Sequence, residues 1–260
     1  MTTPRTRIEL KHNPIFPDPL LCCVVGATKS GKTYLLFHIL THHEKLIDFN
    51  ELILYIPEIT QKDPEYLFLK HGFEKGIPPS IINSLYHVYK NNKNLFPEDI
   101  EEICEVTRKS PEVISKLQPP ISVLISHKPS EDVLLNNKKT CVILDDVLGE
   151  KNQTFQQNLF QRGRHGNCSV FYLAQNFTNL DKNTIRENTT CYIIFRQKET
   201  NLNRIINNIE TSLENKEFRM KCKEAWKNKY GYIYINTRAE DNEVEMTDNI
   251  LIKKTIKKTK

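Results

Sequence analysis

The chain has 260 residues, of which 38% are apolar and 27% charged, and its formal net charge at pH 7 is +5. This composition is lean but sufficient for one hydrophobic core, which excludes a globally disordered protein. No apolar run reaches the length of about 18 residues that a membrane-spanning helix needs. Residues 1–11 are polar and lack the apolar core of a signal peptide, so we expect an intracellular protein without a membrane partner.

Cysteine usage agrees with an intracellular location. The seven cysteines are an odd number, and no two of them have the Cys-x-x-Cys spacing. Four of them lie inside apolar runs that are typical of strands, which predicts buried, reduced thiols. These four are Cys22, Cys23, Cys141 and Cys191.

The first part of the chain has the pattern of a strand, a glycine loop, a helix and a second strand. Residues 20–25 form a short apolar run that ends at Gly26, and a mostly apolar helical stretch follows from Lys32. Residues 51–56 predict a second buried strand, which Pro57 ends. This order is that of a parallel βαβ unit.

Residues 59–119 differ from the segments on either side. They are richer in polar residues and proline and show helical periodicity, so they predict a helical insertion, with a further strand at 121–126. The alternating pattern of strands and helices then resumes. It predicts strands at 141–144, 169–174, 191–195 and 230–235, and helices at 151–162, 200–210 and 214–226. The expected organisation is an extension over 1–14, one domain over 15–240, and a charged, disordered tail over 241–260.

The loop after the first strand carries the clearest chemical signal. Residues 26–33 match the pattern G-x-x-x-x-G-K-[ST], after an apolar strand and before a helix. Such a loop turns its backbone N–H groups toward phosphate oxygens, the lysine reaches the β- and γ-phosphates, and the hydroxyl binds Mg²⁺. The expected ATP-binding residues are Gly26, Ala27, Thr28, Lys29, Ser30, Gly31, Lys32 and Thr33.

Two aspartates follow the apolar run 141–144. A P-loop needs an acidic residue at the tip of a neighbouring buried strand, so we expect Asp145 to contact Mg²⁺ together with Thr33. Asp146 is placed to polarise the attacking water as a general base, and an N-cap of the following helix is the alternative. Gln175 ends another strand, where its amide would sense the γ-phosphate or hold the lytic water, unless it is a turn residue.

Three arginines are candidates for stabilising charge during catalysis. Arg162 and Arg164 lie close to Gly163 and Gly166, and Arg186 precedes the run 191–195. They would either stabilise a transition-state phosphate in a neighbouring subunit or contact DNA phosphates, and a solvated loop is the alternative. Residues 151–239 carry 15 basic and 7 acidic side chains, a net charge of +8 that suits a sequence-independent grip on DNA.

The order of these motifs resembles a known family. The string from Arg162 through Gln175 to Arg186, the loop at 26–33 and the paired aspartates are similar to genome-packaging ATPases of double-stranded DNA viruses. These form the poxvirus-, virophage- and Polinton-type branch of the FtsK/HerA superfamily. The resemblance covers residues 15–58 and 138–236 but not the insertion at 59–119. The superfamily often has Glu at the catalytic position, and Asp146 departs from that while fitting this viral branch.

The resemblance implies an α/β fold, a RecA-like P-loop NTPase of the ASCE type. Its central sheet would be mostly parallel and flanked by helices, with an extra strand that carries Gln175 between the P-loop strand and the Asp145 strand. It also implies a homo-oligomeric ring with ATP between subunits, duplex DNA in the channel and a capsid protein as partner. Lys32, Thr33 and Asp145 would bind Mg-ATP, Asp146 would be the catalytic acidic residue, and Gln175 would be the sensor. Arg162, Arg164 and Arg186 would be the candidates for an arginine that acts in trans, without a choice among them. The expected location is the host cytoplasm or nucleus at sites of virus assembly, or the virion.

Three other functions share parts of this pattern. Another P-loop motor, such as a conjugation or filamentous-phage assembly ATPase, would be favoured by a membrane-spanning segment. A non-hydrolysing nucleotide-dependent adaptor would have a vestigial site, against which the intact Lys32, Thr33 and both aspartates argue. A P-loop kinase would need a phosphate-acceptor pocket and a set of lid arginines, which the insertion at 59–119 would have to contain.

Overall fold

The computed structural model describes residues 11–130, 133, 138–146, 153–240 and 243–251, without the side chain of residue 164. Its centre is an eight-stranded sheet with the order β3-β2-β4-β5-β1-β6-β7-β8. The strands are β1 (Leu21–Val25), β2 (Glu51–Tyr55), β3 (Ser122–Ser126), β4 (Thr140–Asp145), β5 (Cys168–Ala174), β6 (Cys191–Phe195), β7 (Tyr232–Asn236) and β8 (Met246–Thr247).

Six neighbouring strands are parallel to one another: β3, β2, β4, β5, β1 and β6, in the order of the sheet. Strands β7 and β8 extend the sheet through antiparallel pairs of β6 with β7 and β7 with β8. Strands β1, β5 and β6 are buried along their full length, which agrees with their continuous apolar sequences. Strand β5 pairs with β1 on one side and with β4 on the other. The predicted extra strand between the P-loop strand and the Asp145 strand is therefore confirmed.

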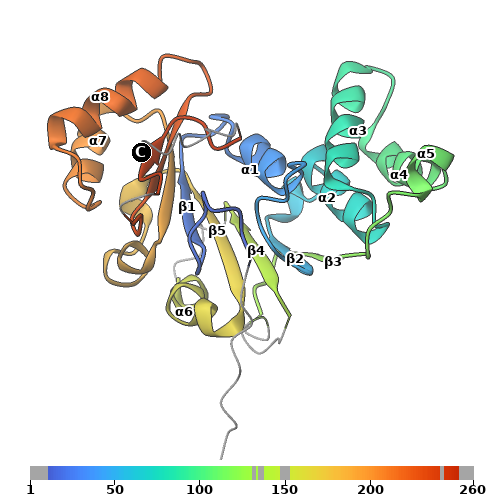
Figure 1. Cartoon of the computed structure of the whole chain (residues 1–260), viewed down its shortest axis with the longest axis horizontal. Helices are drawn as coiled ribbons and strands as arrows, with labels where there is room; N and C mark the ends of the chain where they lie inside the picture. Colours follow the sequence, from blue (N-terminus) through green and yellow to red (C-terminus); the bar gives the residue numbers. More distant parts are fainter. Residues whose placement is uncertain (1–10, 131–132, 134–137, 147–152, 241–242, 252–260) are drawn as a thin grey trace, which may run out of the picture.

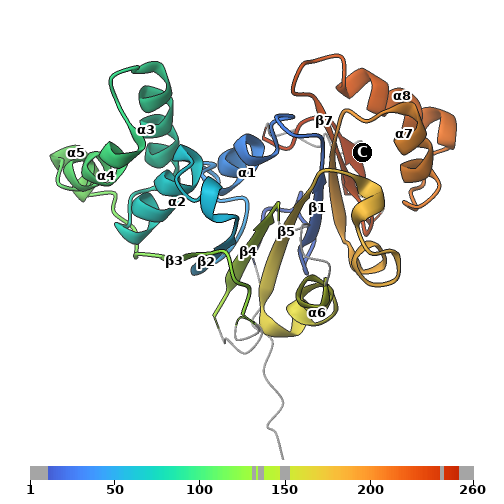
Figure 2. The same cartoon turned by 180° about the vertical axis from the view of Figure 1, so that it is seen from behind.

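Helices cover both faces of this sheet (Figures 1 and 2). Helices α1 and α2 contribute side chains to the apolar core on one face, and α6, α7 and α8 contribute to the core on the other. The helices are α1 (Lys32–Leu40), α2 (Pro64–Glu74), α3 (Pro79–Asn91), α4 (Ile100–Arg108), α5 (Pro111–Ile114), α6 (Thr154–Arg162), α7 (Glu199–Ile206) and α8 (Asn215–Ala225). The architecture is the predicted α/β fold with a mostly parallel central sheet.

The helical insertion joins β2 to β3 and contains α2 to α5. Three of its helices begin with a proline, at Pro64, Pro79 and Pro111, where the missing N–H leaves no helical hydrogen bond unmade. The insertion projects beyond the β2–β3 side of the sheet (Figures 1 and 2). Helix α2 packs against α1 and β3, so the insertion shares the core of that face.

The structure corrects the prediction for the C-terminal tail. We expect disorder over 241–260, but Met246–Thr247 form β8 and pair with β7. Ile250 is buried in the core beside α1, with 3% of its surface exposed. Short strands such as β8 leave little periodic signal, and the charged residues around it favour the prediction of a tail. The lysine-rich end, residues 252–260, lies outside the described residues.

All seven cysteines are free and buried, which confirms the prediction made for the four that lie in apolar runs. In the described part of the chain, no helix combines the length and apolar character needed to cross a bilayer.

Candidate nucleotide-binding site

The glycine loop follows the carboxyl end of β1 and is closed by two glycines. The Gly26 N–H donates to the Ala174 carbonyl of β5, 3.0 Å away, which fixes the start of the loop at the sheet. A Cβ on Gly26 would lie 2.5 Å from Ser30 Oγ and 2.8 Å from Phe195 Cβ, so a side chain has no room there. Gly31 has a φ of 103°, which only glycine adopts without strain.

The N-terminus of α1 is free to receive an anion. Gly31 is its N-cap and provides no side-chain hydrogen bond, and the first turn holds no acidic residue. The orphan N–H groups and the positive end of the helix dipole therefore point into the loop. Ser30 Oγ is buried beside them without a hydrogen-bond partner in the described residues. These groups fit the phosphates of a nucleotide.

The backbone of the first two residues of the glycine loop holds Lys32 over that loop. Its Nζ donates to the Gly26 carbonyl at 2.8 Å and to the Ala27 carbonyl at 3.2 Å. Burial lowers the pKa of this ammonium, while the charges of Asp145 and Asp146 act against that shift. A phosphate oxygen would provide the same ammonium with a stronger, charged acceptor.

Thr33 and Asp145 meet across the gap between α1 and β4. Thr33 Oγ1 donates to Asp145 Oδ2 at 3.0 Å. Burial raises the pKa of the Asp145 carboxyl, and hydrogen bonds from Tyr66 and Thr33 and the charge of Lys32 oppose the rise. Hydroxyl and carboxylate oxygens are the ligands that Mg²⁺ prefers, and a cation would offset the cost of burying this carboxylate. The donor set therefore fits a magnesium site.

A third side chain at this carboxylate comes from the insertion. Tyr66, on α2, is buried and its hydroxyl also donates to Asp145 Oδ2. Tyr66 belongs to no recognisable motif, because it lies in the insertion that the family resemblance leaves out, 79 positions from Asp145. The apolar face of α2 gave the only sequence signal, and it indicates burial rather than a polar contact.

Asp146 and Gln175 are brought together at the ends of β4 and β5. Gln175 Nε2 donates to Asp146 Oδ1 at 3.0 Å, and both side chains are exposed. Asp146 has a φ of 54°, in the left-handed region, so the backbone changes direction directly after Asp145. The Asp145 carboxylate accordingly contacts Thr33, whereas the Asp146 carboxylate contacts Gln175. The alternative role of Asp146 as a helix N-cap involves residues 147–152, which lie outside the described residues.

The three arginines lie at the other end of the sheet. Arg162 ends α6 just before β5 begins, whereas the glycine loop follows the carboxyl ends of the parallel strands; Figure 1 shows α6 and the start of α1 at opposite ends. Arg162 is exposed. Arg186 Nη1 donates to Asn208 at 3.3 Å and its guanidinium lies 5.1 Å from the Phe177 ring centroid. The fold does not bring these arginines to the glycine loop of their own chain.

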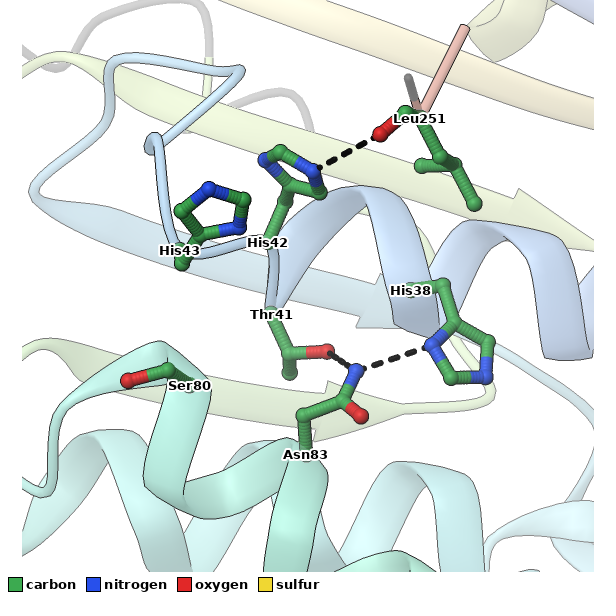
Figure 3. Close-up of a pocket in the computed structure, with 7 residues that line it drawn as sticks. All are labelled: His38, Thr41, His42, His43, Ser80, Asn83 and Leu251. Atoms are coloured by element: carbon green, nitrogen blue, oxygen red, sulfur yellow. Dashed lines mark hydrogen bonds between the residues drawn. The ribbon is translucent and has the colours of Figure 1, made fainter. Parts of the chain in front are cut away.

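A pocket of about 250 Å³ lies beside the C-terminal end of α1 (Figure 3). Asn83 of α3 donates to Thr41 Oγ1 at 2.9 Å and its amide lies 2.8 Å from His38 Nδ1. His42 Nε2 lies 3.1 Å from the Leu251 carbonyl. Burial lowers the pKa of His38 to about 4 and lowers that of His42, so neither provides a cation for an anionic ligand near neutral pH. The pocket instead marks where α3 and the C-terminal segment contact α1.

A model of the poxvirus A32 protein family matches residues 8–258, nearly the complete chain. The chain belongs to the poxvirus A32 family. It is accordingly a P-loop ATPase, and its family is one of viral genome-packaging ATPases. The family match spans the insertion that the resemblance in the sequence leaves out.

Solved structures include several with a similar arrangement. The genome packaging NTPase B204 from Sulfolobus turreted icosahedral virus 2, in complex with sulfate, has 15% identity and a TM-score of 0.47 over 87% of this chain and 93% of that chain. The same NTPase with ATP-gammaS has 13% identity and a TM-score of 0.46 over 84% and 92%. VirB4 of Thermoanaerobacter pseudethanolicus has 14% identity and a TM-score of 0.40 over 76% and 83%. Comparison with curated protein sequences gave no match.

Proposed function

We propose that the protein is an ATP-driven double-stranded DNA translocase that packages a viral or virus-derived genome into a capsid. The observation that carries the proposal is the convergence of Lys32, Thr33 and Asp145 on an uncapped helix N-terminus, in a chain of the poxvirus A32 family. The protein would act in the host cytoplasm or nucleus at sites of virus assembly, or in the virion. Its partners would be duplex DNA and a capsid protein.

ATP would bind with its phosphates in the loop 26–33 and would be hydrolysed by direct attack of water. Thr33 and Asp145 would hold Mg²⁺, which neutralises charge on the β- and γ-phosphates when bound. Lys32 would contact the β- and γ-phosphate oxygens as a fixed positive charge. Asp146 would accept a proton from the attacking water, whose oxygen would bond to the γ-phosphorus as the bond to the β–γ bridging oxygen breaks in line, so that ADP and inorganic phosphate are released. The Gln175 amide orients the Asp146 carboxylate through their hydrogen bond.

A ring of subunits is part of the proposal, because the chain places its arginines far from its own loop. In a ring, the end of the sheet that carries Arg162 would face the glycine loop of the next subunit and supply a trans-acting guanidinium. Arg162 is better placed for this than Arg186, which is held by Asn208 and Phe177 inside its own chain. Arg164 remains a candidate whose side chain lies outside the described residues.

Steady-state ATPase assays with and without long linear duplex DNA, at low and moderate salt, test the proposal. A DNA motor that grips phosphates should be stimulated strongly by duplex, and the stimulation should fade as salt rises. The Lys32→Ala variant is the control and should lose turnover under every condition. Turnover that ignores DNA would argue for another kind of P-loop motor or a kinase, and no turnover at all would argue for an adaptor.

A further inference from the structure

An exposed aromatic ring lies directly beside the glycine loop. Tyr230, in the turn between α8 and β7, has 55% of its surface exposed. A Cβ on Gly31 would lie 3.4 Å from Tyr230 Cδ1 and 3.6 Å from Phe195 Cε1, so the ring stands at the start of α1. A nucleoside attached to phosphates in the loop would therefore begin within reach of this ring.

The ring forms one wall of a pocket of about 350 Å³. The pocket combines the aromatic rings of Tyr230 and Tyr232 with polar groups of Asn228, Lys229 and Asp248. Its size is at the small end of the range of about 300–1,000 Å³ for small-molecule sites, and an apolar wall with a few polar groups is their usual lining. A flat heteroaromatic base, apolar on its faces and polar at its edge, matches this surface.

The turn that carries Tyr230 is tightly built. A Cβ on Gly231 would lie 1.8 Å from the Ala225 carbonyl oxygen, so the backbone can run this close to the end of α8 only with glycine. The Gly231 N–H also donates to the Asn228 carbonyl at 3.1 Å. Lys229 Nζ lies over the Tyr230 ring, 5.1 Å from its centroid, so one face of the ring already contacts a cation.

Another exposed aromatic residue near the loop is oriented differently. Tyr34 is 47% exposed on the first turn of α1, but its ring centroid lies 4.3 Å from that of His38 and 6.2 Å from that of Tyr86 in the insertion. Tyr34 is thus used in packing between α1 and α3, on the side of α1 that faces the insertion. Tyr230, in contrast, lines a pocket and also lies beside Gly31.

We propose that the pocket at Tyr230 is the nucleobase subsite of the nucleotide site, with the base stacked on the Tyr230 ring. The proposal rests on the proposed function, because it requires that the loop 26–33 binds the phosphates. It assigns the base-binding role to the turn between α8 and β7, away from the insertion. Asn228 and Asp248 then lie where they can hydrogen-bond the edge of the base.

Two ligands separate the base subsite from the phosphate site: Mg-ATP and inorganic tripolyphosphate with Mg²⁺. Tripolyphosphate has the three phosphates and lacks the nucleoside, so calorimetric titration of both ligands isolates the contribution of the base. For Tyr230→Ala we expect the Kd of ATP to rise about 10-fold, within the range for a lost base–aromatic stack, with the Kd of tripolyphosphate unchanged. Tyr230→Phe keeps the ring and should bind both ligands like the wild type.

Phe96→Ala is the matched control, since Phe96 is an exposed aromatic residue (62%) of the insertion and should affect neither Kd. An unchanged ATP affinity in Tyr230→Ala would overturn the subsite while leaving the phosphate site intact. Equal loss of affinity for both ligands would also overturn it, because Tyr230 would then support the loop rather than the base. A wild-type protein that binds neither ligand, or a Lys32→Ala variant that binds both normally, would instead refute the nucleotide site itself.

Discussion

The hydrogen bond between Tyr66 and Asp145 leads to a prediction about how the insertion acts on the magnesium site. In Tyr66→Phe the ring is kept and only the hydroxyl is removed. Tyr66 is 1% exposed, and its hydroxyl and that of Thr33 both donate to Asp145 Oδ2. The variant therefore leaves a largely buried carboxylate with one of these two donors, without opening a cavity as large as a side chain.

The size of the effect follows from the charge of the acceptor. A hydrogen bond to a charged group contributes about 1.5–3 kcal/mol, so Tyr66→Phe should lower the free energy of unfolding of the ligand-free protein by about 2 kcal/mol. In a chain of this size that corresponds to a Tm lower by roughly 4–8 °C. Bound Mg²⁺ would give the carboxylate a new partner, so part of this loss should disappear when Mg-ATP is added. The Tm rise on adding Mg-ATP should thus be larger for Tyr66→Phe than for the wild type.

Thermal unfolding with and without saturating Mg-ATP measures both quantities. Tyr86→Phe is the matched control, because Tyr86 is another 1% exposed tyrosine of the insertion and its hydroxyl donates to a carboxylate, that of Glu65. Tyr86→Phe should lower the Tm of the ligand-free protein, while the rise in Tm on adding Mg-ATP should stay at the wild-type value. An equal rise in Tm on adding Mg-ATP in Tyr66→Phe and Tyr86→Phe would show that the Tyr66 hydroxyl does not act through the magnesium site.

Three further variants test separate parts of the structure. Asp146→Asn keeps an oxygen that can accept from Gln175, so calorimetry should find Mg-ATP binding intact while turnover falls by about 10²–10⁴-fold; loss of binding as well would make Asp146 a metal ligand. Gly231→Ala forces a Cβ to within 1.8 Å of a backbone carbonyl and should lower the free energy of unfolding by about 1–3 kcal/mol in urea, and an unchanged midpoint would contradict the close approach. Because burial lowers the pKa of His38 from 6.5 to about 4, the unfolded chain takes up a proton before the folded one as pH falls. Because the ring is partly exposed and solvent screens the effect, the wild type should lose at most about 1 kcal/mol of stability from this group between about pH 7.5 and pH 5, and His38→Gln should lose less; equal losses would refute the shift.

The sequence predicts the parallel part of the fold well because each central strand is buried on both faces. The runs at β1, β4, β5 and β6 contain few polar residues, and no alternating pattern is needed to recognise them. The position of β5 between β1 and β4 comes from the family resemblance, since apolar runs carry no information on strand order. The two-residue strand β8 depends on its pairing with β7, a contact that local sequence does not encode.

The sequence also locates most groups at the proposed site, because the chemistry of phosphate binding requires fixed spacing within a single loop. Thr33 and Asp145 are 112 positions apart, yet each could be found from its own motif. Tyr66 has no such motif, and its role depends on the rotation of α2 about its axis and on where the insertion packs. The same holds for Tyr230, whose position beside Gly31 results from the turn between α8 and β7.

The placement of the insertion gives it contacts with both ends of the P-loop helix. At the N-terminal end, Tyr66 of α2 reaches the carboxylate that accepts from Thr33. At the C-terminal end, Asn83 of α3 bonds Thr41 and contacts His38. Since α2 and α3 pack on each other, a shift of either helix would disturb hydrogen bonds at the opposite ends of α1 together. The insertion is therefore part of the structure that positions the proposed magnesium site, which explains why segments 15–58 and 138–236 alone do not describe that site completely.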